Sequence, residues 1–502
     1  MGKKIMGLSA LFHDAAVAML DDDQIVFAGH SERYGPKIKL DKHLNKELIR
    51  DCVKTHGIPE EVAWYEKPFA KKQRQIYAGE WKQVLSNNSP KAYLKPYMNG
   101  AIGGIPSFRA PLSTFEHHYS HACAGYYTSP FRDATIIVID AIGEWDTLTI
   151  WEAKDQKITK LHSTRYPHSL GLLYTAFTDH IGLKPLHEEY ITMGMAAYGQ
   201  PIYYEQIKNQ FIQEMGNGSF KLKRNVHKGL AFKPKIKDDM PPEYDIACSI
   251  QALTEDVVHN VMRFAQRISK SKNLVYMGGV ALNCKANSTI THMWDDVWIM
   301  PSPGDSGNAL GAALAKRNEW VEWKTPFLGY NIDRPYPVKQ IIAELKKTKI
   351  CGVANGRAEF GPRALGHRSL LADPRGPSIK DKVNAIKKRQ KFRPFAPAIL
   401  EEHVHDYFDM PKGVDISPYM QFTAICKKPH LFPAIVHYDK SSRVQTVGKN
   451  DSTGFRKLLE AWYKETGCPM LLNTSLNIRG KPMVNDEQDA KDWEAEYRVK
   501  VY

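Results

Sequence analysis

The fold of this chain is constrained most strongly by four segments. In each of them an apolar strand runs directly into a polar or glycine-rich turn. KIMGLSALFHDAAVAML followed by DDDQIVFAGHSER predicts a strand, a turn at the aspartates and a second strand, and DATIIVIDAIGEWDTLTIWEA predicts two strands with Asp140 at the end of the first. LVYMGGVALNCKANSTI predicts a strand, a Gly-Gly turn and a helix, and DVWIMPSPGDSGNALGAALAKRN predicts a strand before a helix of small residues. Glycines let backbone amides approach phosphates, and acids at strand ends bind the accompanying metal. The order of these segments therefore predicts an α/β domain that holds a nucleotide between two lobes.

The segment TFEHHYSHACAGYY, which begins at Thr114, contains three histidines within five residues. If it is helical, His117 and His121 share one face, and His118 points about a quarter-turn away. Two histidines at this spacing can clamp a metal ion. The alternative is a helix whose histidines cap the chain or satisfy polar neighbours, and the spacing alone leaves both open.

Composition places the chain among ordinary globular proteins. Its 502 residues suffice for two or three domains, 43% are hydrophobic and 25% are charged. No apolar run approaches the roughly 20 residues that span a bilayer, and the first residues lack the features of a signal peptide, so we expect a cytoplasmic protein without a membrane partner. The seven cysteines are scattered without a CxxC pair, which argues against a disulfide framework and a thiolate zinc site. We find no internal repeat and no low-complexity segment.

Positive charge is concentrated in one part of the chain. Of the net charge of +14, residues 351–400 contribute +8, from 11 Lys and Arg against 3 Asp and Glu. Gly and Pro are interleaved with these cations in GRAEFGPRALGHRSLLADPRG and KKRQKFRPF, which favours a folded anion pocket over a charged tail. The segment KTPFLGYNIDRPYPVKQ, near 325–340, is rich in Pro, Gly and Tyr and predicts a boundary between domains at 1–330 and 331–502.

Ten separated motifs, in the same order over nearly the whole chain, resemble the O-carbamoyltransferases of nodulation-factor and antibiotic tailoring. The motifs are FHDAAVA, EHHYSHA, HSLGLLYTAFTDHIG, MGMAAYG, GGVALNCKAN, GDSGNALGAAL, GRAEFGPRALGHRSLLADPR, FRPFAPAIL, RVQTV and LLNTSLNIRGKP. The resemblance implies an α/β protein with a two-lobed actin-like ATPase (ASKHA) domain, similar to the tRNA threonylcarbamoyl-transfer enzymes. A smaller α/β carbamoyl-adenylate-forming (YrdC-like) domain would follow it.

The resemblance also implies a two-step reaction and its cofactors. The second domain would form carbamoyl-adenylate and pyrophosphate from carbamoyl phosphate and ATP, with Mg²⁺, and the first would move the carbamoyl group to an alcohol. By similarity His117, His121 and Asp305 would hold a divalent metal, Fe²⁺ in the family, with His118 beside them. His13 would be the catalytic base, because a hydroxyl is a poor nucleophile at neutral pH. The expected nucleotide-binding residues of the first domain are Asp140, Gly278, Gly279 and Asn283.

The adenylating site is expected among the cations of the second domain. Carbamoyl phosphate and ATP are both polyanions and repel each other, so a site where they meet needs guanidinium and ammonium groups. Carried over by position from the family, the lining residues are Arg363, Arg368, Lys387, Arg393, Arg443, Ser475 and Asn477. Surface ion pairing is the alternative for these cations.

Two departures from the family pattern affect these expectations. Asp140 is followed by Ala141 where the family usually has glycine, which adds a methyl group beside the expected phosphate. The C-terminal segment VNDEQDAKDWEAEYRVKVY lacks the longer apolar stretch of the family, so we expect altered packing of the second domain.

The acceptor is suggested by two further basic stretches, 71–109 and 221–237. Each has seven Lys or Arg, and only the first contains an acid, Glu80. Aromatic residues lie among them: Tyr77, Trp81, Tyr93, Tyr97, Phe108 and Phe232. Basic residues follow a phosphate backbone and aromatic rings stack on bases, so the leading hypothesis is a hydroxymethylated pyrimidine in DNA or as a nucleotide.

Several alternatives remain open on the sequence. A small-molecule alcohol such as a sugar or antibiotic precursor is the alternative acceptor, and each basic stretch can instead be a solvated face. Threonylcarbamoyl transfer to tRNA is the rival enzyme class, and a nucleotide-gated binding module is the non-enzymatic one. The oligomeric state is open, a homodimer included.

Overall fold

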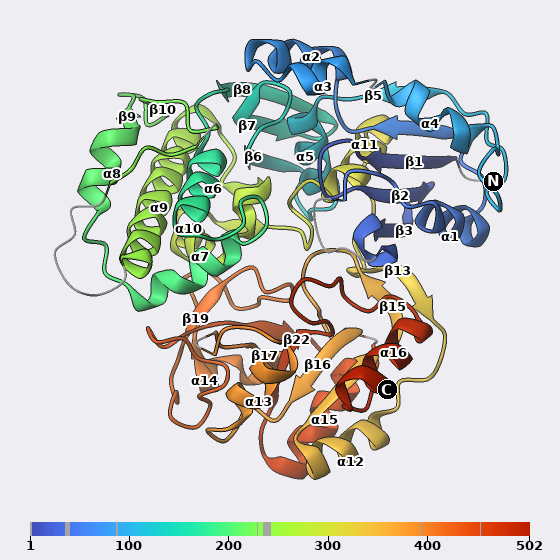
Figure 1. The fold of residues 1–502 in the computed structure, drawn as a ribbon, viewed down its shortest axis with the longest axis vertical. Coiled ribbons are helices and arrows are strands. Elements are labelled where there is room, and N and C mark those ends of the chain that lie inside the picture. Colours follow the sequence, from blue (N-terminus) through green and yellow to red (C-terminus); the bar gives the residue numbers. More distant parts are fainter. Residues whose placement is uncertain are drawn as a thin grey trace. The chain divides into compact units, whose positions relative to one another are not determined.

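The chain forms two compact units (Figure 1). The structure is a computed structural model that describes residues 3–35, 41–86, 89–227, 229–233, 242–391, 393–451 and 453–502. The first unit comprises Met1–Ala28 and Leu40–Lys324, and the second comprises Gly29–Lys39 and Thr325–Tyr502. The segment Gly29–Lys39 thus belongs to the second unit although it lies within the sequence of the first.

Two five-stranded sheets of the first unit repeat the same topology. Their strand orders are β3-β2-β1-β4-β5 and β8-β7-β6-β11-β12. In each sheet, the central strand (β1 or β6) pairs antiparallel with the next strand in sequence (β2 or β7) and parallel with β4 or β11, respectively. That last strand in turn pairs parallel with β5 or β12. The strands are β1 (Lys4–Ser9), β2 (Ala16–Asp21), β3 (Gln24–His30), β4 (Glu61–Trp64), β5 (Leu112–Thr114), β6 (Asp133–Ile139), β7 (Asp146–Lys154), β8 (Lys157–Arg165), β11 (Asn273–Met277) and β12 (Asp296–Trp298).

The N-terminal hairpin differs from the prediction in one respect. KIMGLSALFHDAAVAML was expected to form one strand, but it forms β1 and β2, which pair antiparallel, and the turn at the aspartates joins β2 to β3. Leu11 and Asp14 have positive φ, 72° and 52°, so the chain reverses between them. Alternation of apolar residues continues through this turn, so the pattern alone does not reveal it. The reversal places His13 in a turn at the end of β1.

Two helices of the first unit pack closely against each other. Helix α5 (His117–Tyr126) follows β5, and α11 (Gly307–Arg317) follows β12, so they occupy the same place in the two repeats. A Cβ atom at Gly311 of α11 would lie 2.0 Å from the Ser120 carbonyl oxygen of α5. Only glycine permits this approach, and the small residues of GNALGAALAKR thereby bring the N-terminal ends of both helices near each other.

The remaining elements of the first unit cover these sheets or form a helical part beside the second sheet (Figure 1). They are α1 (Lys46–His56), α2 (Pro68–Tyr77), α3 (Trp81–Leu85), α4 (Pro90–Met98), α6 (Leu170–His180), α7 (Glu189–Met195), α8 (Tyr204–Phe211), β9 (Ile212–Glu214), β10 (Phe220–Leu222), α9 (Glu243–Ile268) and α10 (Cys284–Ile290). The predicted succession of strand, Gly-Gly turn and helix is confirmed by β11 and α10. Within the described residues, no helix is both long and apolar enough to cross a bilayer.

The second unit is built on a mixed sheet with the order β14-β16-β22-β17-β21. Helices α12, α13, α15 and α16 accompany this sheet, and shorter strands form the pair β13-β15 and the sheet β18-β19-β20. The bounds are β13 (Phe327–Ile332), α12 (Val338–Thr348), β14 (Ile350–Ala354), β15 (Gly356–Glu359), β16 (Arg368–Ala372), α13 (Ile379–Ile386), β17 (Ala396–Leu400), α14 (Val404–Tyr407), β18 (Phe408–Asp409), β19 (Thr423–Cys426), β20 (Ser441–Arg443), β21 (Gln445–Val447), α15 (Gly454–Thr466), β22 (Met470–Ser475) and α16 (Glu487–Tyr497).

The C-terminal segment is part of the core of this second unit. Trp493 of α16 and Val501 both belong to its buried apolar cluster, and Val501 forms a parallel bridge with Gly352 of β14. The expected α/β class is confirmed for both units.

Candidate functional site

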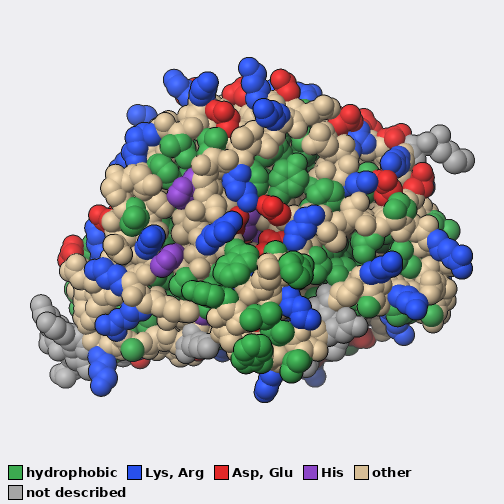
Figure 2. Space-filling model, turned by 90° about the horizontal axis from the view of Figure 1, so that it is seen from above, with side chains coloured by type: hydrophobic (Ala, Val, Ile, Leu, Met, Phe, Trp, Pro, Cys, Tyr) green, Lys and Arg blue, Asp and Glu red, His purple; other side chains and the backbone are tan. Residues whose placement is uncertain are grey.

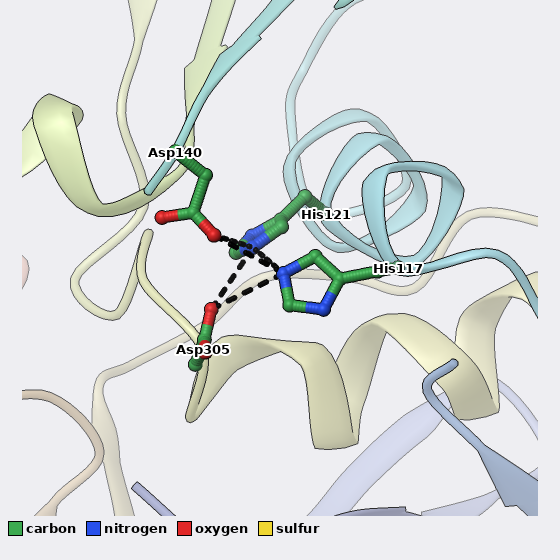
Figure 3. A group of neighbouring side chains, drawn as sticks. All are labelled: His117, His121, Asp140 and Asp305. Atoms are coloured by element: carbon green, nitrogen blue, oxygen red, sulfur yellow. Dashed lines mark hydrogen bonds and ion pairs between the residues drawn. The ribbon is translucent and has the colours of Figure 1, made fainter. Parts of the chain in front are cut away.

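Four buried side chains from separate parts of the first unit converge on one point (Figure 3). His117 and His121 come from α5, Asp140 follows β6, and Asp305 lies just before α11. One ligand atom from each residue lies within 4.8 Å of all the others. The predicted helix is confirmed, and the structure brings together the three residues expected at a metal, with Asp140 as a fourth.

The distances within this cluster, which we call the His–Asp cluster, join imidazole nitrogens to carboxylate oxygens. His117 Nε2 lies 3.2 Å from Asp140 Oδ2 and 3.3 Å from Asp305 Oδ1. His121 Nε2 lies 3.4 Å from Asp305 Oδ1, 3.8 Å from Asp140 Oδ2 and 3.2 Å from His117 Nε2. Donor atoms bound about 2.1 Å from one metal ion lie roughly 3 to 3.5 Å apart, so these separations suit a shared cation.

The chemistry of the donor set also fits a divalent cation. Within the described residues, neither side-chain oxygen of buried Asp305 has a hydrogen-bond partner, although the His13, His117 and His121 nitrogens lie within ion-pair distance. Buried carboxylate oxygens without donors are costly unless a cation binds them. Two imidazoles with two carboxylates suit a first-row divalent metal such as Fe²⁺ or Zn²⁺.

The duplicated topology explains why these residues meet. Asp140 occupies the turn after the central strand β6, and His13 occupies the corresponding turn after the central strand β1. The α5 histidines and Asp305 lie at the N-terminal ends of the two equivalent helices. Each repeat therefore contributes one turn residue and one helix end to the site.

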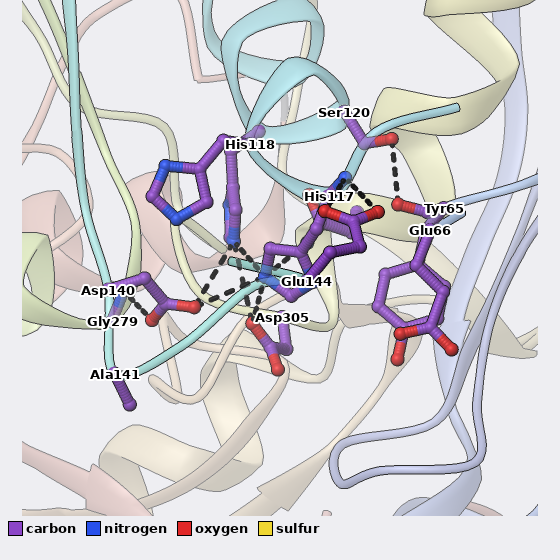
Figure 4. Close-up of polar contacts among 12 residues, drawn as sticks. Tyr65, Glu66, His117, His118, Ser120, Asp140, Ala141, Glu144, Gly279 and Asp305 are labelled. Carbon is purple, nitrogen blue, oxygen red and sulfur yellow. Dashed lines mark hydrogen bonds and ion pairs between the residues drawn. The ribbon is translucent and has the colours of Figure 1, made fainter. Parts of the chain in front are cut away.

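A buried carboxylate that the sequence did not single out holds the start of α5 in place. The Glu144 side chain accepts hydrogen bonds from the backbone N–H groups of His117, at 3.0 Å, and Lys67, at 2.6 Å (Figure 4). Burial raises the pKa of Glu144, which opposes its ionisation in this position. Asn308 is a second residue missed by the sequence analysis, with its Nδ2 3.4 Å from His117 Nε2. Its position in GDSGN, three residues after Asp305, was the available signal.

His118 is not part of the His–Asp cluster. Its Nδ1 lies 2.9 Å from the Thr149 hydroxyl, and burial together with neighbouring His117 lowers its pKa to about 3. The imidazole is therefore neutral and serves as a packed neighbour.

His13 lies against Asp305. Its Nε2 is 3.4 Å from Asp305 Oδ2, and its Nδ1 is 3.1 Å from Asp14 Oδ2. Burial alone would lower the pKa of His13, but the carboxylates of Asp305 and Asp14 raise it to about 9. The predicted base thus lies at the edge of the His–Asp cluster, with both ring nitrogens next to carboxylates.

The expected nucleotide-binding residues divide into two groups. Asp140 Oδ1 accepts a hydrogen bond of 2.9 Å from the Gly279 N–H, so Asp140 links the His–Asp cluster to the Gly-Gly turn. Gly278 has φ of 92°, and a Cβ there would lie 2.2 Å from the Ile139 carbonyl oxygen, which explains the glycine. Asn283, in contrast, is engaged structurally: its Oδ1 caps α10 at the Ala286 N–H, and its amide pairs with Gln251.

Ala141 does not crowd the His–Asp cluster. Figure 4 shows its methyl group pointing away from the Asp140 carboxylate and from Gly279. Its carbonyl oxygen accepts a hydrogen bond of 2.6 Å from the Ser169 hydroxyl, which also caps α6.

In the second unit, three of the residues that were expected to line the adenylating site lie in contact with one another. Lys387 is buried, and its ammonium donates to the Ser475 hydroxyl, at 3.2 Å, and to the Asn477 amide oxygen, at 2.8 Å. It also donates to the backbone carbonyls of both residues. Burial, followed by the charges of Arg389 and Arg393, lowers the pKa of Lys387. We call this group the Lys387 cluster, and Arg393 is close enough to affect its charge.

Arg368 is engaged in a way that the sequence did not predict. Its side chain is fully buried, and its guanidinium donates to five backbone carbonyl groups. The acceptors are those of Tyr330, Asn355, Gly356, His367 and Asn485. No donor remains for a phosphate, so we assign Arg368 a structural role in place of the expected anion contact.

The loop that contains Arg363 is organised by a carboxylate that the sequence analysis missed. Glu359 is buried, and its Oε1 accepts from the backbone N–H groups of Leu365, His367 and Arg368 at 2.8, 3.0 and 3.1 Å. Arg363 and Arg443 are half-buried, and their participation in an anion site stays a prediction.

Within their described residues, the two basic stretches bury several of the side chains that were expected to stack on bases or contact phosphates. Tyr97, Phe108 and Phe232 are buried, and the Tyr97 hydroxyl donates to the Leu44 carbonyl. Lys71 and Arg74 are also buried and pair with Glu66 and Glu80. Residue 228 and residues 234–237 of the second stretch lie outside the described residues. Among the six aromatic residues named above, Tyr77 and Trp81 are the exposed ones.

These observations define a two-unit α/β protein with a buried imidazole–carboxylate centre in one unit and a buried cationic centre in the other. Two family profiles match the chain, the carbamoyltransferase N-terminus over residues 4–314 and the carbamoyltransferase C-terminus over residues 342–502. The chain belongs to the carbamoyltransferase family and is a transferase.

Known proteins of similar sequence support this assignment. An uncharacterized protein of Synechocystis, sll1178, is 32% identical over 97% of this chain and 93% of its own length. The nodulation protein NolNO of Sinorhizobium fredii is 30% identical over 96% of this chain and 76% of its own. Among solved structures, HypF of T. kodakarensis matches 64% of this chain and 48% of its own at 13% identity, with a TM-score of 0.34, which is too distant for an argument about fold.

Proposed function

We propose that this carbamoyltransferase is an ATP-dependent O-carbamoyltransferase that works through carbamoyl-adenylate. In the first step carbamoyl phosphate, water and ATP give carbamoyl-adenylate, phosphate and pyrophosphate, as the carbamate oxygen bonds to the α-phosphorus and the bond to the β-phosphate breaks. In the second step an alcohol oxygen bonds to the carbamoyl carbon, AMP leaves and the hydroxyl proton passes to a base. The first step would be performed by residues Thr325–Tyr502. The second step would be performed by residues Leu40–Lys324 together with the N-terminal strands.

The Lys387 cluster supports the assignment of the first step. The ammonium of Lys387 donates to neutral oxygens of Ser475 and Asn477, and the nearby Arg389 and Arg393 carry further positive charge. A buried cation whose hydrogen-bond partners are neutral oxygens can bind an incoming phosphate strongly, since water screens it little. We propose a YrdC-like fold for this domain.

The single observation that carries the assignment of the second step is the position of His13 beside Asp305 of the His–Asp cluster. His117, His121, Asp140 and Asp305 would hold a divalent metal, for which we propose Fe²⁺. With that cation offsetting the charge of Asp305, which otherwise raises the pKa of His13, the neutral imidazole of His13 would take the proton from the acceptor hydroxyl. A bound cation supplies Lewis acidity at the carbamoyl or phosphate oxygen and offsets the charge of Asp305. The repeated sheet topology supports an actin-like two-lobed domain, with ATP-derived phosphate beside Gly278 and Gly279.

For the acceptor we propose a small-molecule alcohol, with a free hydroxymethylpyrimidine nucleotide among the candidates. The observation behind this choice is the burial of Tyr97, Phe108, Phe232, Lys71 and Arg74, which removes them from any groove for polymeric DNA. Base stacking and backbone neutralisation both require exposed side chains.

The test is mass spectrometry of candidate acceptors after incubation with enzyme, ATP and carbamoyl phosphate. Sugars, hydroxymethylated nucleosides, nucleotides and hydroxymethylated DNA serve as parallel acceptors. A carbamoyl adduct on a small alcohol, with pyrophosphate release that depends on carbamoyl phosphate, is the expected result. Adduct on DNA alone would reverse the acceptor assignment, and ATP turnover without carbamoyl phosphate would point to a nucleotide-gated module.

A further inference from the structure

Helix α2 (Pro68–Tyr77) buries polar and charged side chains and exposes apolar ones, which is the reverse of an ordinary surface helix. The side chains that it buries fully are Lys71, Arg74 and Gln75. Phe69, Lys72, Gln73 and Ile76 follow the spacing i, i+3, i+4 and i+7, so they share the opposite face, and all four are exposed. A surface helix normally turns its apolar side chains inward, so exposed Phe69 and Ile76 combined with buried charges indicate a binding surface.

The buried charged side chains of α2 both form ion pairs, so these pairs stabilise the helix with its charges inward. Lys71 Nζ lies 2.8 Å from Glu66 Oε2 and 5.4 Å from the centre of the Phe12 ring. Arg74 pairs with Glu80 and also donates to the Glu144 carbonyl oxygen. These contacts fix which face of the helix points outward.

Helix α3 (Trp81–Leu85) continues the exposed apolar face. We call the five exposed hydrophobic residues of the two packed helices the α2–α3 patch: Phe69, Ile76, Tyr77, Trp81 and Leu85. Phe69 is 75% exposed, Trp81 60% and Leu85 84%, so these side chains protrude. Figure 2 looks down on the face of the molecule that includes α2 and shows exposed hydrophobic side chains with Lys and Arg side chains, and some Asp and Glu side chains, among them.

The exposed charged side chains of helices α2 and α3 have one sign. Lys72 and Lys82 lie within the two helices and are exposed, and Lys91 and Lys95 follow on α4. Between residues 67 and 110 the sequence contains one acid, Glu80, and Arg74 pairs with it. A second copy of the chain would oppose lysines to lysines, which disfavours self-association. The patch therefore requires a partner that offers apolar contact and negative charge together.

We propose that the α2–α3 patch is a peripheral docking surface for an anionic lipid bilayer, in contrast to the expectation from the sequence of no membrane partner. Phe69, Ile76 and Leu85 would enter the acyl boundary, Trp81 and Tyr77 would lie at the headgroup level, and Lys72 and Lys82 would contact lipid phosphates. Apolar insertion combined with basic residues is the pair of signals that stable peripheral binding needs. A nucleic-acid platform fits less well, because Ile76 and Leu85 have no ring to stack and the Tyr77 ring already packs on Trp145 and Tyr166.

The experiment is co-sedimentation of the full chain with vesicles of phosphatidylcholine alone and of phosphatidylcholine with phosphatidylglycerol. The wild type should bind the anionic vesicles and release as salt is raised. Each lysine beside an anionic leaflet contributes about fivefold, so Lys72→Glu with Lys82→Glu should weaken binding about 25-fold or more. Phe69→Gln with Leu85→Gln should weaken binding to anionic vesicles at both low and high salt.

Matched control variants separate this surface from general effects of charge and hydrophobicity. Lys270→Glu with Lys272→Glu changes the charge equally at exposed positions elsewhere, and Ile58→Gln with Ile202→Gln removes exposed apolar side chains outside the patch. Both controls should bind vesicles like the wild type. The proposal is overturned by no binding to anionic vesicles, or by equal loss in patch and control variants. It is also overturned if the patch variants retain vesicle binding but lose binding of a single-stranded oligonucleotide, or shift a dimer to monomer.

Discussion

The two units satisfy their buried charges in opposite ways. In the first unit the imidazoles of His117 and His121 face the carboxylates of Asp140 and Asp305, and neither oxygen of Asp305 receives a hydrogen bond from a described residue. In the second unit Lys387 donates to neutral oxygens of Ser475 and Asn477. A site of the first kind is completed by a cation and a site of the second kind by an anion. In the proposed mechanism the two half-reactions call for opposite electrostatics, and each unit would supply one of them.

Removal of both helix histidines should have the largest effect and test the cation side of this comparison. In the His117→Ala, His121→Ala double variant, metal content should fall from about one divalent ion per chain to none, because two of four donors are lost. Carbamoyl transfer should fall by at least about 10⁴-fold, while carbamoyl-phosphate-dependent pyrophosphate release continues. His118→Gln is the control, since His118 lies outside the His–Asp cluster, and it should retain the metal. Unchanged metal content in the double variant would contradict a cation site.

Arg368→Met should show that a buried cation of the second unit can have a structural role and need not bind an anion. The change leaves carbonyl groups of five residues without their donor, so the free energy of unfolding should fall by roughly 3–5 kcal/mol. Denaturant or thermal unfolding measures this loss. Arg393→Met is the matched variant, because Arg393 is half-buried and lies near Lys387: it should fold like the wild type and lose pyrophosphate release. The structural assignment of Arg368 fails if the two variants behave in reverse.

His13→Gln should separate the two half-reactions. Glutamine keeps polar contact with Asp305 but cannot accept a proton, so transfer should fall by about 10² to 10³-fold. Pyrophosphate release and metal content should match those of the wild type, which direct assays of both would establish. Equal loss of both half-reactions in a folded variant would refute the proposed division of labour.

Asn283→Ala should have the smallest effect and test a residue expected to bind nucleotide. Because the side chain caps α10 and pairs with Gln251, its loss should lower the free energy of unfolding by about 1 kcal/mol. Nucleotide affinity, measured by calorimetry, should be unchanged. Asn283→Ser, which can still cap the helix, should recover most of the stability, and a large loss of nucleotide affinity in either variant would restore the binding role.

Part of the site could be predicted from local sequence alone. The spacing of His117 and His121 and the positions of Asp140, Gly278 and Gly279 at strand ends are local properties, and the structure places them as strand and helix periodicity predicts. The roles of Arg368 and Asn283 were not predictable in this way. A guanidinium or amide is suited to a ligand or to a backbone carbonyl, and the choice depends on residues far away in sequence, such as Tyr330 and Asn485 for Arg368.

The sequence by itself determined the α/β class, the placement of His117 and His121 on one face of a helix and the residues that resemble the family. Only the tertiary structure revealed that the first unit repeats one topology twice, since the sequence has no detectable repeat and topology depends on which strands pair. Only the tertiary structure added Asp140 to the His–Asp cluster and turned Lys71 and Arg74 inward, with Phe69 and Ile76 outward. The physical reason is that burial and charge pairing are decided by contacts between distant segments, whereas periodicity and turn chemistry act within a few residues.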